Sequence, residues 1–275
     1  MRRIPESASS AARVLITLIA IVSGFLWGCP GQVRAQSGQM ILSLGDDSYI
    51  TWSELESRTG AVVKREAGDA PLDDFSLLVL SNVSYTSLPE GVRDGLRGYL
   101  EQGGAMLITG GKQSYGSGGY ADTELADLLP LRPSRDDWLP HPFGPTLILQ
   151  PGHPILKGIE IPTMAFFNEL DLNGGAVEIA QYRKASKAGI VGGGDPGGGQ
   201  IQGGGRRPMP LIAERRSDAG TILAVALDLA LTGEWKDRNR FAQNCAEYLL
   251  QQSRIVPPQK RSNLDRGAPS TCCAT

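Results

Sequence analysis

Short apolar runs alternate with amphipathic stretches along the first half of this 275-residue chain. The runs are continuous, as expected of strands that are covered on both faces of a sheet. They predict strands at 39–44, 61–66, 75–83 and 105–111. The stretches between and after them predict helices at 51–60, 88–104 and 121–129. Strands that alternate with helices indicate an α/β fold, with a doubly wound and mostly parallel sheet.

Local sequence signals mark where two of these helices begin and end. Ser53 and Glu56 have the spacing of a capping box, which predicts the start of the first helix. In the helix at 88–104, the pair Gly103–Gly104 predicts the end. Thr123 is the expected start of the helix at 121–129.

The second half of the chain is less regular. Residues 130–145 are rich in proline and predict a surface excursion, and two further strands are expected at 146–150 and 175–183. The clearest antiparallel hairpin joins 210–216 to 221–228. A last helix, 237–252, has one apolar face that is expected to bury Phe241, Cys245, Tyr248 and Leu249.

The composition of the ends and of one internal segment predicts the domain boundaries. Arginines precede an apolar run at 14–27, which is too short to span a membrane, and small residues at Val33 and Ala35 indicate a secretory signal peptide, 1–35. The alternative is a lipoprotein box with Cys29 as the acylated residue, the one case in which we expect membrane attachment. The α/β domain is then 36–252, followed by a disordered tail at 253–275.

The glycine-rich segment 184–207 lies inside the predicted domain. Its glycine density is incompatible with a packed core, so we expect a mobile hairpin loop there.

Charge and cysteine content exclude several classes of function. The net charge is −2 and no basic stripe is present, which argues against nucleic-acid binding. The four cysteines form no C-x-x-C pair, so a structural zinc site is not expected. The acidic pairs Asp136–Asp137 and Glu169/Asp171 lack a calcium-loop pattern and predict a solvated surface rather than a metal site.

In the stretch 105–120, AMLITGGKQSYGSGGY, a predicted strand is followed by a segment rich in glycine, serine and tyrosine that also contains Lys112. Such a segment is a candidate for a phosphate-binding loop, a nucleophile elbow or a tight turn. A phosphate-binding loop is excluded, because Met106 stands at the first required glycine and Gln113 follows Lys112. No nucleotide or other cofactor is therefore expected. A nucleophile elbow would need a base, and the conceivable hydrolase uses Ser114 with His153 and Glu169.

The third interpretation of this stretch is a tight structural turn that overhangs a binding site. In open α/β sheets, ligands bind beyond the carboxyl ends of the strands. Groups at or after predicted strand ends are therefore the candidate ligand-binding residues. They are Asn82, Gly110, Gly111, Lys112, Ser114, Tyr115, Asp228 and Trp235. Asp228 and Trp235 could offer an acidic group and an aromatic platform, for example to a sugar; alternatively, Asp228 caps a turn and Trp235 covers the sheet.

Residues 78–131 closely resemble the glutamine amidotransferase-like domain of bacterial envelope proteins, and the likeness extends more loosely over 39–252. The matching elements are Ser87-Leu88-Pro89, Gly103-Gly104, Gly110-Gly111, Ser114-Tyr115-Gly116, Gly118-Gly119-Tyr120 and Leu128-Leu129-Pro130. The resemblance implies a class I amidotransferase-like, flavodoxin-like fold. The glycine-rich segment 184–207 departs from the family pattern.

The resemblance does not carry the family's glutaminase chemistry to this chain. Active members use an elbow cysteine with a downstream His and Glu, whereas this elbow holds Lys112, Gln113 and Ser114. We therefore expect an exported, periplasmic or extracellular module that is non-catalytic and binds a small molecule or an envelope protein. Related chains suggest von Willebrand A-type membrane proteins as partners. The alternatives are the Ser114–His153 hydrolase and a carbohydrate-related activity.

Overall fold

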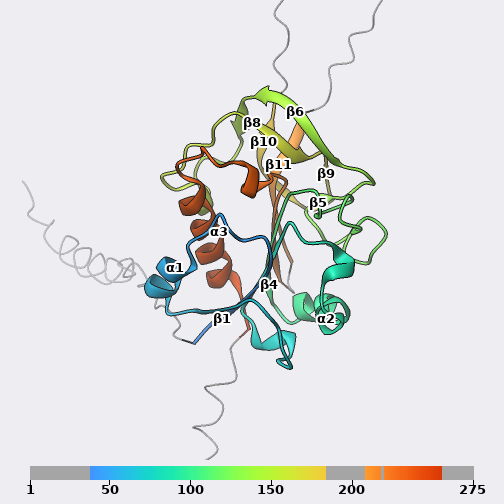
Figure 1. Ribbon diagram of the computed structural model, residues 1–275, viewed down its shortest axis with the longest axis vertical. Coiled ribbons are helices and arrows are strands. Elements are labelled where there is room, and N and C mark those ends of the chain that lie inside the picture. The colour runs from blue at the N-terminus through green and yellow to red at the C-terminus, as the bar shows by residue number, and fades with distance from the viewer. Residues whose placement is uncertain (1–37, 184–207, 218–219, 256–275) are drawn as a thin grey trace, which may run out of the picture. The chain divides into compact units, whose positions relative to one another are not determined.

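The computed structural model describes residues 38–183, 208–217 and 220–255 (Figure 1). The predicted signal peptide 1–35, the glycine-rich segment 184–207 and tail residues 256–275 lie outside the described residues.

One eight-stranded sheet forms the centre of the domain, in the order β2-β1-β3-β4-β12-β11-β10-β7. Its first five strands are parallel, and β11, β10 and β7 continue the sheet antiparallel. The strand bounds are β1 Met40–Gly45, β2 Val62–Lys64, β3 Leu77–Ser81, β4 Ala105–Thr109, β7 Thr146–Ile148, β10 Val177–Tyr182, β11 Met209–Arg216 and β12 Thr221–Val225. Every residue of β3, β4 and β12 is buried, which explains their continuous apolar runs. The α/β class, the mostly parallel sheet and the late antiparallel hairpin are confirmed.

Within the described ranges, three α-helices cover the sheet: α1 Trp52–Thr59, α2 Glu90–Glu101 and α3 Arg238–Gln252. Figure 1 shows α1 and α3 on one side of the sheet and α2 on the other. The expected apolar face of α3 is confirmed, because Phe241, Cys245, Tyr248 and Leu249 are all buried. Burial raises the pKa of the Cys245 thiol far above its ordinary value, so this cysteine is a packing residue. None of the helices in the described ranges is both long and apolar enough to cross a bilayer.

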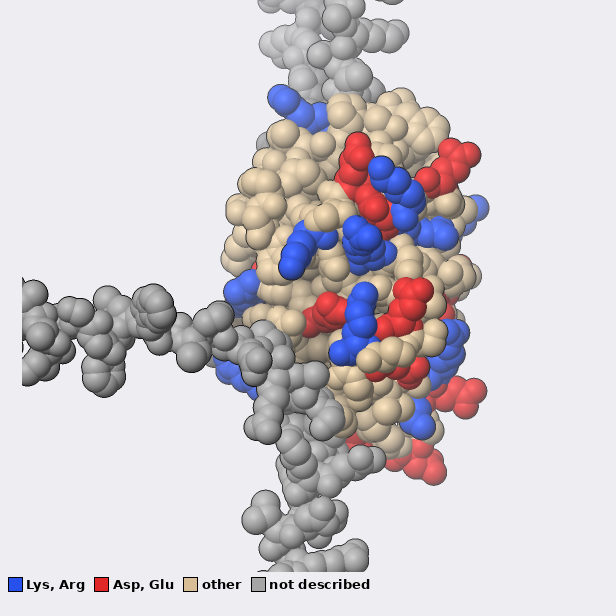
Figure 2. Space-filling model, turned by 90° about the vertical axis from the view of Figure 1, so that its left-hand side faces the viewer, with Lys and Arg blue, Asp and Glu red and all other residues tan. Residues whose placement is uncertain are grey.

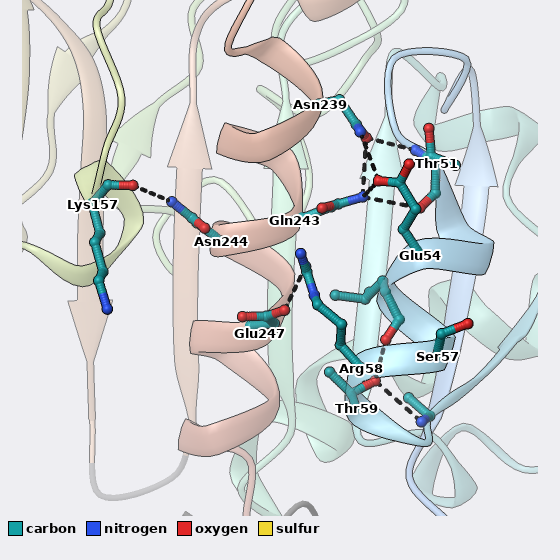
Figure 3. Close-up of polar contacts among 12 residues, drawn as sticks. Thr51, Glu54, Ser57, Arg58, Thr59, Lys157, Asn239, Gln243, Asn244 and Glu247 are labelled. Atoms are coloured by element: carbon teal, nitrogen blue, oxygen red, sulfur yellow. Dashed lines mark hydrogen bonds and ion pairs between the residues drawn. The ribbon is translucent and has the colours of Figure 1, made fainter.

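Polar side chains join α1 to α3 (Figure 3). Gln243 is buried, and its amide nitrogen donates to the Thr51 carbonyl at 3.1 Å and to Glu54 Oε2 at 2.8 Å. Hydrogen bonds from Gln243 and Asn239 lower the pKa of Glu54. Arg58 on α1 pairs with Glu247 on α3 at 2.5 Å. Figure 2 shows acidic and basic side chains interspersed on the face it presents, without a large area of one sign.

The predicted capping box is wrong. The helix begins at Trp52 after Thr51, one residue before Ser53. Glu56 does not reach back to the helix start, because its Oε1 accepts a hydrogen bond from the Val63 backbone N–H at 2.9 Å. The side chain thus fixes the entry to β2 instead of the start of α1.

The predicted helix at 121–129 is also wrong, because the segment is a series of turns. Hydrogen bonds of the i to i−3 kind run from Ala126 to Thr123 and from Leu128 to Leu125, at 3.1 and 2.9 Å. The segment is too short to repay helix nucleation between the glycines before it and Pro130 after it. Its buried leucines still contribute to the core.

The proline-rich residues 130–145 form strands rather than an irregular excursion. β5 Leu131–Arg132 pairs with β9 Asp171–Leu172, and β6 Trp138–Gly144 pairs with β8 Met164–Asn168. Pro140 and Pro142 are accommodated because β6 has a strand on one side only.

Candidate functional site

The carboxyl ends of β3 and β4 bring the first predicted site residues together. Asn82 follows β3 with a φ of 44°, a left-handed conformation that asparagine tolerates. Its Oδ1 accepts a hydrogen bond from the Gln113 backbone N–H at 2.9 Å, which ties the end of β3 to the loop after β4. Asn82 therefore lies beside the loop that follows β4.

Gly110 and Gly111 are required by the close approach of other backbone and side-chain atoms. A Cβ on Gly110 would lie 2.0 Å from the Ala226 carbonyl oxygen. Gly111 has a φ of +144°, and a Cβ there would lie 2.1 Å from Asn82 Oδ1. These glycines therefore serve the local packing of the loop.

All four hydroxyls of the elbow loop, defined here as residues 110–120, donate to backbone carbonyls. Ser114 Oγ donates to the Thr109 oxygen at 2.5 Å, and Ser117 Oγ to the Ser114 oxygen at 2.9 Å. Tyr115 and Tyr120 donate to Ile108 and Val83, at 3.3 and 3.1 Å. Ser114 is 1% exposed, and burial raises the pKa of Tyr115 well above its ordinary value. The hydroxyls therefore hold the loop in shape.

Two residues that sequence reasoning did not place in the site, Asn168 and Asp137, fix the elbow loop. Asn168 is fully buried at the end of β8; its Oδ1 accepts from the Gly111 N–H at 2.9 Å, and its Nδ2 donates to Asp137 Oδ1 at 2.8 Å. Asp137 is 2% exposed and accepts from the Gly116 and Ser117 N–H groups at 2.8 and 3.2 Å. The expectation that Asp137 belongs to a solvated acidic pair is therefore wrong, whereas Asp136 beside it is exposed.

The structure does not bring Ser114, His153 and Glu169 together. His153 contacts β11 and α3. Its Nε2 is 3.5 Å from Glu214 Oε2 on β11, and its ring packs edge-on against the Tyr248 ring on α3, with 4.9 Å between the ring centres. His153 Nδ1 accepts from the Ile155 N–H at 3.4 Å, so both ring nitrogens are engaged. Glu169 is exposed, with an oxygen 4.0 Å from His141 Nε2. The geometry of the predicted triad is thus contradicted.

The buried carboxylate of Glu214 contacts His153, Tyr248 and the half-exposed Arg216. Burial alone would raise the pKa of Glu214, but hydrogen bonds from His153, Arg216 and Tyr248 outweigh it and lower the pKa to about 2. Arg216 Nε donates to Glu214 Oε1 at 2.9 Å, and the Tyr248 hydroxyl donates to the same oxygen. These contacts anchor β11 to α3 and to the turn that holds His153.

We expect Glu214→Gln to lower the free energy of unfolding by about 1.5–3 kcal/mol at pH 7, the range for hydrogen bonds to a charged group. Because the folded pKa of Glu214 is depressed, its contribution is present above the unfolded pKa of about 4.3 and is lost as the pH falls toward about 2. Urea unfolding at pH 7, 4 and 2.5 should show the two proteins converging at the acid end. A constant difference over that range would contradict this assignment.

Trp235 has the covering role that was one of its two alternatives, and Trp138, for which the sequence suggested no role, lies at the elbow loop. Trp235 is buried, donates from Nε1 to the Glu160 carbonyl at 2.7 Å and packs on Phe241, so it covers the core and offers no platform. Trp138 instead lies at the loop: the Lys112 ammonium is 5.1 Å from its ring centre. Of these two tryptophans, Trp138 is therefore the one beside the elbow loop.

Asp228, which follows β12, is a buried acid with 2% exposure. Burial raises its pKa, which the backbone at Leu231 and the Trp138 indole partly offset. Asp228 Oδ1 and Trp138 Nε1 are both buried, and the indole lies near enough to the carboxylate to lower its pKa, but neither atom completes a hydrogen bond of good geometry within the described parts of the chain. Unpaired buried polar atoms are costly, and they are common where a ligand or water binds.

In the ranges that the structure describes, no group of three or more His, Cys, Asp or Glu side chains is arranged to hold a metal ion.

No protein-family model matches the chain, and no curated protein matches it. Solved structures do. The cytoplasmic protein STM3548 from Salmonella typhimurium is 13% identical, with a TM-score of 0.56 over 76% of this chain and 98% of that one. A ThuA-like protein from Bacteroides uniformis is also 13% identical, with a TM-score of 0.52 over 84% and 99% of the two chains. At this identity the likeness shows the fold alone: the chain has an α/β architecture that is similar to that of ThuA-like proteins.

Proposed function

We propose that this chain is a catalytically silent, amidotransferase-like α/β domain that binds a small polar ligand at the carboxyl edge of its sheet. One observation carries the proposal: the four hydroxyls of the elbow loop all donate to backbone carbonyls, and the buried hydroxyl of Ser114 has no imidazole beside it. A nucleophile needs a base within hydrogen-bond reach. The Ser114–His153 hydrolase therefore has no geometric support.

The ligand chemistry follows from the two unpaired atoms of this edge. Asp228 Oδ1 is an acceptor and Trp138 Nε1 is a donor. The indole already faces the carboxylate without a hydrogen bond of good geometry, and a hydroxyl group that enters between them would donate to Oδ1 and accept from Nε1. This favours a carbohydrate-like ligand over an anion, which Asp228 would repel. Lys112, which is exposed above the indole, is the side chain that would move to admit it.

Location and partners belong to the same proposal. The features of residues 1–35 support export to the periplasm or the extracellular space, with lipid anchoring if Cys29 is acylated. The resemblance to envelope proteins supports a membrane protein with a von Willebrand A-type module as a partner. The N-terminal residue and the mass of the mature protein would decide between cleavage after Ala35 and acylation at Cys29.

A panel of mono- and disaccharides and linear polyols, measured by thermal shift and calorimetry, tests the ligand assignment. A binder is expected to lose at least about tenfold in affinity, about 1.4 kcal/mol, with Trp138→Phe, which keeps the ring and removes the N–H. Asp228→Asn should weaken it similarly, whereas Trp235→Phe should leave the affinity unchanged. Binding that neither Trp138→Phe nor Asp228→Asn alters, or no binding by any hydroxylated compound, would refute the assignment.

A further inference from the structure

The carboxylate of Asp137 lies in a ring of N–H donors. Its Oδ2 accepts from the backbone of Gly116 at 2.8 Å and of Ser134 at 3.4 Å. Its Oδ1 accepts from the backbone of Ser117 at 3.2 Å and from Asn168 Nδ2 at 2.8 Å. Four donors therefore converge on one side chain that is 2% exposed.

All four donors are neutral amides. No Lys, Arg or His of the described ranges forms an ion pair with Asp137, whereas the buried carboxylates of Asp47 and Glu214 each have an arginine partner. Successive backbone N–H groups that converge on one point are the geometry by which proteins bind anions. The four N–H donors are thus arranged as in an anion-binding site, and the Asp137 carboxylate is the anion that they bind.

The local backbone is shaped for this contact. Tyr115 has a φ of 51°, which turns the chain so that the next two amides point the same way. A Cβ on Gly116 would lie 1.3 Å from the Ser134 carbonyl oxygen, so only glycine lets the two segments approach closely enough. The elbow loop and the segment around Asp137 are therefore fitted to each other through the carboxylate.

We propose that the elbow loop contains an anion-binding cradle, formed by the Gly116, Ser117 and Ser134 amides with Asn168, and that the Asp137 carboxylate is its internal ligand. The ligand class of the cradle is a small carboxylate. In the intact protein Asp137 excludes an external anion from the elbow.

Chemical rescue tests the proposal. Asp137→Ala removes the equivalent of formate, and Asp137→Gly removes the equivalent of acetate, from the full chain. At constant ionic strength, formate is expected to raise the thermal midpoint of Asp137→Ala by at least about 3 °C relative to chloride, a shift well within the response of a domain of this size. Acetate should do the same for Asp137→Gly, and neutral formamide and acetamide should not.

The exposed neighbour provides the matched control. Asp136→Ala removes an exposed carboxylate that accepts none of the four cradle hydrogen bonds, so formate should shift it no more than it shifts the unaltered protein. If either Asp137 variant is unfolded without the anion, near-ultraviolet circular dichroism should report refolding when the anion is added. An equal response to formate and formamide, an equal shift in Asp136→Ala, or no recovery of either Asp137 variant would overturn the proposal.

Discussion

Replacing Asn168 by alanine is expected to lower the free energy of unfolding by about 3–4 kcal/mol, because a fully buried amide that bridges two segments is lost. The substitution leaves the Gly111 N–H without its acceptor and Asp137 without its side-chain donor, at buried positions where water cannot replace them. Guanidinium unfolding followed by circular dichroism measures the change. A loss below about 1 kcal/mol would show that the elbow loop does not depend on this residue.

Asn168→Asp provides a matched variant with a predicted pH dependence. The change keeps the size of the side chain but places a second carboxyl group beside Asp137. Because like charges raise the pKa of one of the pair in the folded state, the folded protein binds a proton that the unfolded chain releases more easily. The destabilisation should therefore be largest at neutral pH and shrink as the pH falls toward 4. A pH-independent loss would contradict the placement of Asn168 against Asp137.

Gly116→Ala is expected to prevent stable folding or to cost more than about 3 kcal/mol, because its Cβ would overlap the Ser134 carbonyl oxygen, a backbone atom that cannot rotate away. Gly98 in α2 is the matched control, since nothing lies within 4 Å of a Cβ there. Gly98→Ala should raise stability by about 0.5–1 kcal/mol through helix propensity. Thermal midpoints of the two variants should move in opposite directions, and a tolerated Gly116→Ala would mean that the two segments are not packed as described.

The sequence predicted the elements that depend on local pattern. The continuous apolar runs of β3 and β4 were sufficient because burial on both faces leaves an unbroken apolar run. The apolar face of α3 was predictable because burial of one stripe leaves a helical period. The segment 121–129 has a helix-like pattern but forms turns, since length and flanking residues decide whether a short helix is stable. The strand β6 was missed because its prolines are compatible with a strand only at an edge, and edge position is a tertiary property.

The candidate site was predictable only in part for the same reason. Asn82 and the two glycines follow strand ends, and parallel strands bring such positions together. Asn168 and Asp137 lie 57 and 26 residues from Gly111 in sequence and meet the loop through β8 and β6, which the sequence did not predict to pair. Nothing local distinguishes Trp138, which lies beside Lys112, from Trp235, which packs in the core.

Labelling of the intact protein with a fluorophosphonate, read by mass spectrometry, tests the central claim that the elbow has no activated nucleophile. No adduct on Ser114 is expected under conditions that fully label an active serine hydrolase, and Ser114→Ala should likewise gain no mass from the reagent. A stoichiometric adduct on Ser114 that disappears in Ser114→Ala would show an activated serine and contradict the account.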